Sequence, residues 1–112
     1  MGSRVLELVA EEFSNDSRPT VGIAVDARTL VVAPIREGGP DIIKVTLFPR
    51  PKDPRGDVFE LERLDLAGNV LRAARADILR LNTWQAVRSL ASWIDAIDSR
   101  GASDVGFASA PA

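Results

Sequence analysis

Residues 20–47 read TVGIAVDARTLVVAPIREGGPDIIKVTL, and apolar residues alternate there with small or polar ones over several short runs. A period of two is typical of strands with one buried face. The turn candidate Asp26-Ala27-Arg28 and the break Gly38-Gly39-Pro40 divide the segment into three pieces. Because these links are short, the sequence predicts an antiparallel meander with strands near 20–25, 30–32 and 43–47.

An amphipathic helix is predicted on each side of the strand-rich region. In residues 4–13, the apolar side chains share one arc of a helical wheel and the charged ones lie opposite. A longer helix is capped by Asn82 or Thr83 and stops at Gly101, with its apolar residues again on one arc. Trp93 lies within that arc, so we expect it in the core.

The segment 58–81 allows two interpretations. Gly68-Asn69 between apolar segments is typical of a hairpin with a two-residue loop. The alternation slips near Glu62-Arg63, so this hairpin requires a bulge. The rival is a helix over about 69–81, which the alanine content suits. The hairpin is favoured because it forms two cross-strand charge pairs, Asp65 opposite Arg72 and Glu62 opposite Arg75.

Together these elements predict an α+β fold. We expect a two-layer sandwich, in which an antiparallel sheet of about five strands carries both helices on one face. The 112 residues fit one compact domain over 1–101 with a flexible tail over 102–112. The sequence has neither an apolar run that could span a bilayer nor a signal-peptide pattern, so we expect a small soluble domain located in the cytoplasm.

The composition argues against most kinds of enzyme. The chain has no histidine, cysteine or tyrosine, which supply most general acids and bases, activated nucleophiles and transition-metal ligands. The carboxylate pairs Glu60/Glu62 and Asp95/Asp98 are interpreted as solvated charge, and no phosphate-binding glycine motif is present. We therefore expect no catalytic residue, no metal site and no cofactor.

Two features are candidates for contact with a partner protein. Trp84 falls at the polar edge of the second helix, where an exposed indole would offer a large rigid contact area. The favoured interpretation is nevertheless that it folds back over the sheet near the helix start. The second feature is the proline-rich loop over 49–57, in which Arg50, Lys52 and Arg55 could touch a partner. Its P-x-x-P spacing matches SH3 ligands, but a plain connecting loop is the commoner explanation.

A third feature is a basic segment that could contact phosphate groups. It contains Arg72, Arg75, Arg80 and Arg88 in a protein of net charge −2. The segment lacks the interleaved aromatic residues that stack on bases. Ion pairs with Glu60, Glu62 and Asp65 are therefore the favoured explanation.

Two functional hypotheses follow from these observations. The first is a non-enzymatic protein-binding module, such as an adaptor, a chaperone-like protein or an inhibitor, whose partner is another protein. A free sheet edge would also allow it to pair with itself as a homodimer. The alternative is a small nucleic-acid-binding regulatory protein that uses the arginine-rich segment. Neither hypothesis involves a membrane.

Overall fold

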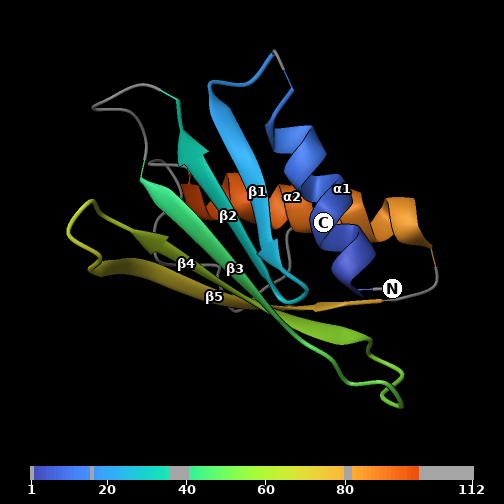
Figure 1. Ribbon diagram of the computed structural model, residues 1–112. Coiled ribbons are helices and arrows are strands. Elements are labelled where there is room, and N and C mark those ends of the chain that lie inside the picture. Colours follow the sequence, from blue (N-terminus) through green and yellow to red (C-terminus); the bar gives the residue numbers. More distant parts are fainter. Residues whose placement is uncertain (1, 16, 36–40, 80–81, 99–112) are drawn as a thin grey trace.

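The computed structural model describes residues 2–15, 17–35, 41–79 and 82–98 (Figure 1). The strands form one antiparallel sheet in the order β1-β2-β3-β4-β5, so β1 and β5 are its edges. The predicted α+β class and the meander are therefore confirmed, whereas the tail predicted over 102–112 lies outside the described residues. The elements in chain order are α1 (Gly2–Phe13), β1 (Thr20–Asp26), β2 (Thr29–Pro34), β3 (Ile42–Phe48), β4 (Asp57–Leu64), β5 (Val70–Ile78) and α2 (Thr83–Asp98).

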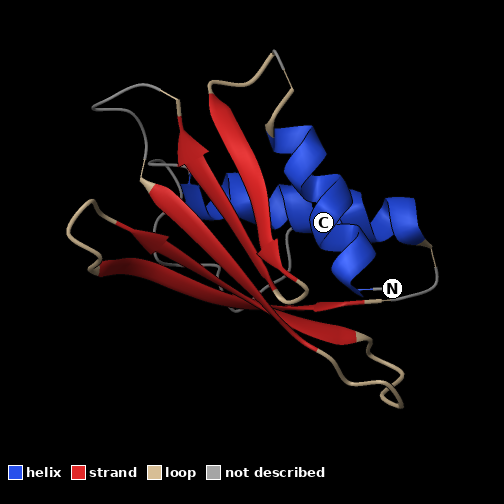
Figure 2. Cartoon of the chain, in the orientation of Figure 1, coloured by secondary structure: helices blue, strands red, loops and turns tan. Residues whose placement is uncertain are grey.

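Both helices pack on the same face of the sheet, which we call the inner face (Figure 2). Helix α1 contacts β1 and β2, α2 contacts β4 and β5, and the two helices contact each other. A single apolar core fills the space between the layers, and Trp93 lies in it as predicted. The largest fully buried side chains include Phe59, Leu6, Leu30, Ile43, Leu61, Leu90 and Ile94.

Helix α1 approaches β1 so closely that only glycine fits at position 22. A Cβ atom on Gly22 would lie 2.7 Å from the carbonyl oxygen of Ala10. The small side of β1, with Gly22 and Ala24, therefore faces the helix, whereas Ile23 and Val25 are 52% and 59% exposed. The strand is confirmed, but its larger apolar side chains point away from the core, because the helix backbone leaves no room for them.

The segment after β4 is the second strand of a hairpin, so the rival prediction of a helix over 69–81 is wrong. The predicted register is also wrong, by two residues. Arg75 lies opposite Glu60 rather than Glu62, and Arg72 lies opposite Arg63 rather than Asp65. The predicted bulge is present, between Arg63 and Leu64.

The register differs because the loop is longer than two residues and Asp65 belongs to it. The Asp65 carboxylate accepts hydrogen bonds from the backbone N–H groups of Ala67 and Asn69, at 2.9 Å each, and from the Asn69 amide at 3.0 Å. These bonds, led by the one from the Asn69 side chain, lower the pKa of Asp65. Gly68 supplies the left-handed backbone conformation of the turn, with φ at 87°.

Candidate functional site

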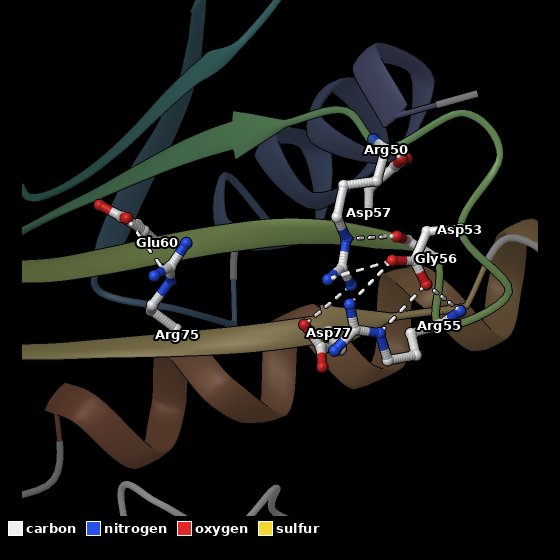
Figure 3. Close-up of polar contacts among 8 residues, drawn as sticks. All are labelled: Arg50, Asp53, Arg55, Gly56, Asp57, Glu60, Arg75 and Asp77. Atoms are coloured by element: carbon white, nitrogen blue, oxygen red, sulfur yellow. Dashed lines mark hydrogen bonds and ion pairs between the residues drawn. The ribbon is translucent and has the colours of Figure 1, made fainter.

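Arg50 ties the loop between β3 and β4 to the end of β5 (Figure 3). Its Nε donates a hydrogen bond to the carbonyl of Gly56 at 3.0 Å, and its Nη2 donates to Asp77 on β5 at 2.9 Å. Its Nη1 lies 3.7 Å from the carboxylate of Asp53. The guanidinium is thus engaged on three sides by the protein itself, which gives it a structural role in this loop.

Arg55 folds back onto Asp53 in the same loop (Figure 3). Its Nη2 and Nε lie 2.8 and 3.1 Å from the two Asp53 oxygens, and its backbone N–H donates to the same carboxylate at 2.8 Å. The Arg55 side chain is the largest cause of a pKa of Asp53 far below the usual aspartate value. Of the three loop residues predicted to contact a partner, Arg50 is half-buried and bound by neighbouring groups, whereas Arg55 and Lys52 are both exposed. Arg55 is nevertheless paired with Asp53.

Asp57 and Gly56 fix the point where this loop enters β4. Asp57 is only 6% exposed, and its carboxylate accepts the backbone N–H of Arg50 at 3.1 Å. Gly56 has a φ of 90°, and a Cβ there would overlap the carbonyl group of Ile78 at the end of β5. The carboxylates of this loop therefore hold its backbone together, rather than converging on a shared cleft.

Trp84 is exposed, so the prediction that it folds back over the sheet is wrong. Its side chain is 62% exposed in the first turn of α2. The helix start is fixed by Asn82, whose side-chain oxygen accepts the backbone N–H groups of Trp84 and Gln85 at 2.9 and 3.2 Å. Asn82 is therefore the N-cap, and the helix begins with the indole directed away from the core.

The arginine-rich segment does not form one face in the described part of the chain. On β5, Arg72 shares the alternation of the inner-facing residues, whereas Arg75 points to the opposite side. The Nε of Arg75 lies 3.6 Å from the carboxylate of Glu60 on β4 (Figure 3). Arg88 is exposed on α2, and Arg80 lies outside the described residues.

The outer face of the sheet, opposite the helices, is divided into an apolar half and a charged half. We call the apolar half, on β1 and β2, the apolar face; its register brings Ile23 opposite Val31 and Val21 opposite Ala33, with Val25 exposed beside them. Both described helices lie on the other face of the sheet (Figure 2). The charged half on β3 to β5 carries Lys44, Glu60, Glu62, Arg75 and Asp77.

The sequence reasoning missed the apolar face. Its signal was present in the alternation of Gly22 and Ala24 with Ile23 and Val25, because a strand that receives a helix backbone at close range must place its small residues on the helix side. An exposed apolar patch with a polar border commonly marks a protein contact surface.

A cavity of about 210 Å³ lies between the end of β5 and the start of α2, lined by Asp77, Leu79, Asn82, Gln85 and Ser89 among others. Asp77, which is the only acidic residue among the described residues of its lining, is already bound to Arg50. Within the described ranges, no three acidic side chains cluster in a way that could hold a metal ion. No helix in the described part of the chain is long and apolar enough to cross a membrane.

Comparisons with protein-family models, with curated proteins and with solved structures find no match for this chain.

Proposed function

We propose that this chain is a protein-binding domain without catalytic activity. The observation that carries the proposal is the apolar face of β1 and β2, where Ile23 and Val25 are more than half exposed on a regular sheet. Side chains of this kind gain free energy when a partner removes them from water, at about 25 cal/mol per Å² of apolar area buried. The partner that fits this face is a protein surface rich in aliphatic side chains.

The roles of the charged residues support a binding function over an enzymatic one. The carboxylates of Asp53, Asp57 and Asp65 each accept backbone hydrogen bonds in loops or turns, and Asp77 binds Arg50. A catalytic carboxylate would instead need to face a substrate-sized cleft together with a second reactive group. Adaptors, chaperone-like proteins and inhibitors in the cytoplasm are the classes that we propose, with self-association of the domain as a second property.

Nucleic-acid binding stays a prediction without a structural feature that favours it. Arg72 and Arg75 point to opposite sides of the sheet, so they would not contact the same phosphate backbone together. Arg75 is also close to Glu60, whose charge opposes the attraction of a phosphate.

The proposal is tested by changing the apolar face without changing the core. Ile23→Lys and Val31→Lys each place a charge in the centre of this face, and Glu62→Lys places the same charge on the charged half as a matched control. Because Ile23 is half exposed, Ile23→Lys should alter the free energy of unfolding by no more than about 0.5 kcal/mol.

The readout is site-directed photo-crosslinking from position 25, followed by mass spectrometry of the crosslinked proteins. We expect the same partner to be crosslinked by the wild type and by Glu62→Lys, and to be lost with Ile23→Lys. Equal crosslinking by all variants would contradict binding at this face, and hydrolytic or transfer activity in the purified protein would contradict the non-enzymatic role.

A further inference from the structure

The outer edge of β5 is the longest strand edge of the sheet, and no segment of the described residues pairs with it. We propose that a second copy of this chain pairs with it in antiparallel orientation, centred on Ala76, so that one continuous sheet runs through both protomers. This inference rests on the self-association included in the proposed function and names the surface that mediates it.

The opposite edge of the sheet is capped at Gly22, in the middle part of β1. On β1, the N–H of Gly22 donates a hydrogen bond to the Ser14 hydroxyl at 2.9 Å, although an edge strand would otherwise offer this group to a partner strand. The Ser14 hydroxyl also lies 3.1 Å from the carbonyl of the same glycine. We therefore expect a second strand to pair with the edge of β5 rather than with that of β1.

The sequence of β5 favours the register centred on Ala76. In an antiparallel pair related by a twofold axis, this register places Arg75 opposite Asp77 of the second copy, and the symmetry repeats the pair. A register centred on Arg75 would place the two arginines opposite each other, which is unfavourable. One centred on Ala74 would place Asp77 opposite Leu71, so that no opposite charge of the second copy faces this carboxylate.

The contacts within each protomer extend this charge pairing. Asp77 is bound by Arg50 at 2.9 Å, and Arg75 lies 3.6 Å from Glu60 (Figure 3). In the proposed dimer, Arg50 and Asp77 of one copy would continue into Arg75 and Glu60 of the other, so that positive and negative groups alternate across the junction. Because of the twofold axis, this series of four alternating charges occurs twice in the dimer.

Small and apolar residues complete the fit. Ala73, Ala74 and Ala76 present little side-chain bulk along the strand. The exposed Leu79, 53% accessible in the monomer, would come opposite Ala73 of the second copy. Each protomer thus offers both a charged pair and an apolar contact to the same edge of its partner.

A charge-swap experiment tests the inference, with mass measured by light scattering during size exclusion. The wild type should be a dimer, and Arg75→Asp and Asp77→Arg should each weaken dimerisation about tenfold, because each places like charges opposite one another twice. The double variant Arg75→Asp/Asp77→Arg should return to within about threefold of the wild type. Arg28→Asp, the same change at the turn between β1 and β2, is the control.

The double variant separates contacts between copies from contacts within one copy. It removes the attraction of position 75 for Glu60 and of position 77 for Arg50, so the monomer should be less stable than either single variant. Recovery of the dimer in this variant could therefore come only from the pair across the junction. A double variant that dimerises as weakly as the worse single variant would overturn the inference.

A crosslinking measurement keeps the test valid if the charge variants fold poorly. The chain has no cysteine, so a single introduced cysteine forms a disulfide only between copies. Ala76→Cys lies on the proposed axis and should crosslink under mild oxidation, whereas Ala73→Cys should not, because it faces position 79 of the second copy.

The remaining outcomes also distinguish this inference from the proposed function. A wild type that stays monomeric at high concentration overturns strand pairing at β5, and the crosslinking from position 25 still decides whether the apolar face binds a partner. A dimer that is lost with Ile23→Lys but kept with Arg75→Asp overturns the β5 interface and assigns self-association to the apolar face instead.

Discussion

The two edges of the sheet differ in how their backbone hydrogen-bonding groups are treated. At β1, the helix lies so close that the residue after it reaches the strand backbone. The Ser14 hydroxyl accepts the N–H of Gly22 at 2.9 Å, and its proton is shared between the carbonyls of Ala10 at 2.9 Å and Gly22 at 3.1 Å. At β5, the described elements leave the backbone edge without a neighbouring strand, although the strand is nine residues long. Edge strands that are left open are natural sites of pairing with other chains.

This difference indicates that a strand edge is capped when a neighbouring helix comes close to the strand backbone. Such an approach requires small residues in the strand. Gly22 lets α1 reach β1, and the larger side chains of the strand are consequently turned to the outer face. The same glycine thus closes the edge and creates the apolar face beside it. Substitutions in β1 and β5 should for this reason have different consequences.

Among the substitutions at strand edges and turns, the largest effect is expected for Gly56→Ala, at the loop that fixes the end of β5. The backbone there has a φ of 90°, and the added Cβ would overlap the carbonyl group of Ile78. We expect a loss of about 3 kcal/mol or more in the free energy of unfolding, because both strain and overlap act on the hairpin of β4 and β5. Urea unfolding followed by circular dichroism measures this loss.

Gly68→Ala provides the control for that measurement. Gly68 has a similar φ of 87° but open space around its Cα, so alanine there should cost only about 1 kcal/mol. Equal losses for the two variants would show that backbone conformation alone, and not contact with the end of β5, determines the need for glycine.

The second effect is expected for Gly22→Val, which should disrupt the contact of α1 with the edge strand β1. The new side chain must displace the backbone of α1 at Ala10, and we expect a loss of about 2–3 kcal/mol together with increased self-association through β1. Unfolding and light scattering measure the two consequences. Ala33→Val adds two of the same three carbon atoms on the outer face, and a loss as large as that of Gly22→Val would contradict the close-approach explanation.

The class of the fold could be predicted from the sequence because the relevant signals are local. The alternation in residues 43–47 and the apolar arc around Trp93 each reflect burial of one face of one element. The N-cap at Asn82 is likewise determined by its own side chain and the next two N–H groups. Such features depend on residues that are close in sequence, so they can be predicted without knowing the tertiary contacts.

The register and the exposed surfaces could not be predicted in the same way, because they depend on contacts distant in sequence. The hairpin register shifts by two residues since Asp65 binds its own loop, which the charge pattern alone did not reveal. The orientation of β1 depends on how close α1 comes, and the roles of Arg50 and Arg55 depend on Asp77 and Asp53. Residue type alone does not specify these neighbours.

A third effect is expected for Ser14→Ala, which opens the β1 edge without moving the helix. The variant leaves the N–H of Gly22 without its 2.9 Å acceptor, and we expect a loss of about 1 kcal/mol. Amide hydrogen exchange at Gly22 should become faster, while exchange in β3 should not change. Ser17→Ala, which removes an exposed hydroxyl, is the control, and unchanged exchange at Gly22 would contradict closure by Ser14.

The fourth effect is the pH dependence of the turn that leads into β5. The hydrogen bonds from Asn69 lower the pKa of Asp65 in the folded state, so the stability that they provide is present above the usual aspartate pKa and is lost as pH falls through the lowered value. Carboxyl NMR titration should give a midpoint for Asp65 below 3.8, and acid unfolding should be less steep for Asp65→Asn. A midpoint at or above 3.8 would contradict these bonds.

The smallest effect on stability is expected at Trp84, although it is one of the largest exposed side chains. Because the indole is 62% accessible, Trp84→Ala should change the free energy of unfolding by less than about 0.5 kcal/mol. Trp93→Ala, which empties a core position, should cost about 3–5 kcal/mol. Acrylamide should quench the fluorescence of Trp84 and leave that of Trp93 nearly unaffected. If dimer formation at β5 protects Trp84 from quenching, the open edge includes the start of α2; if quenching is the same in monomer and dimer, the contact ends on the strand.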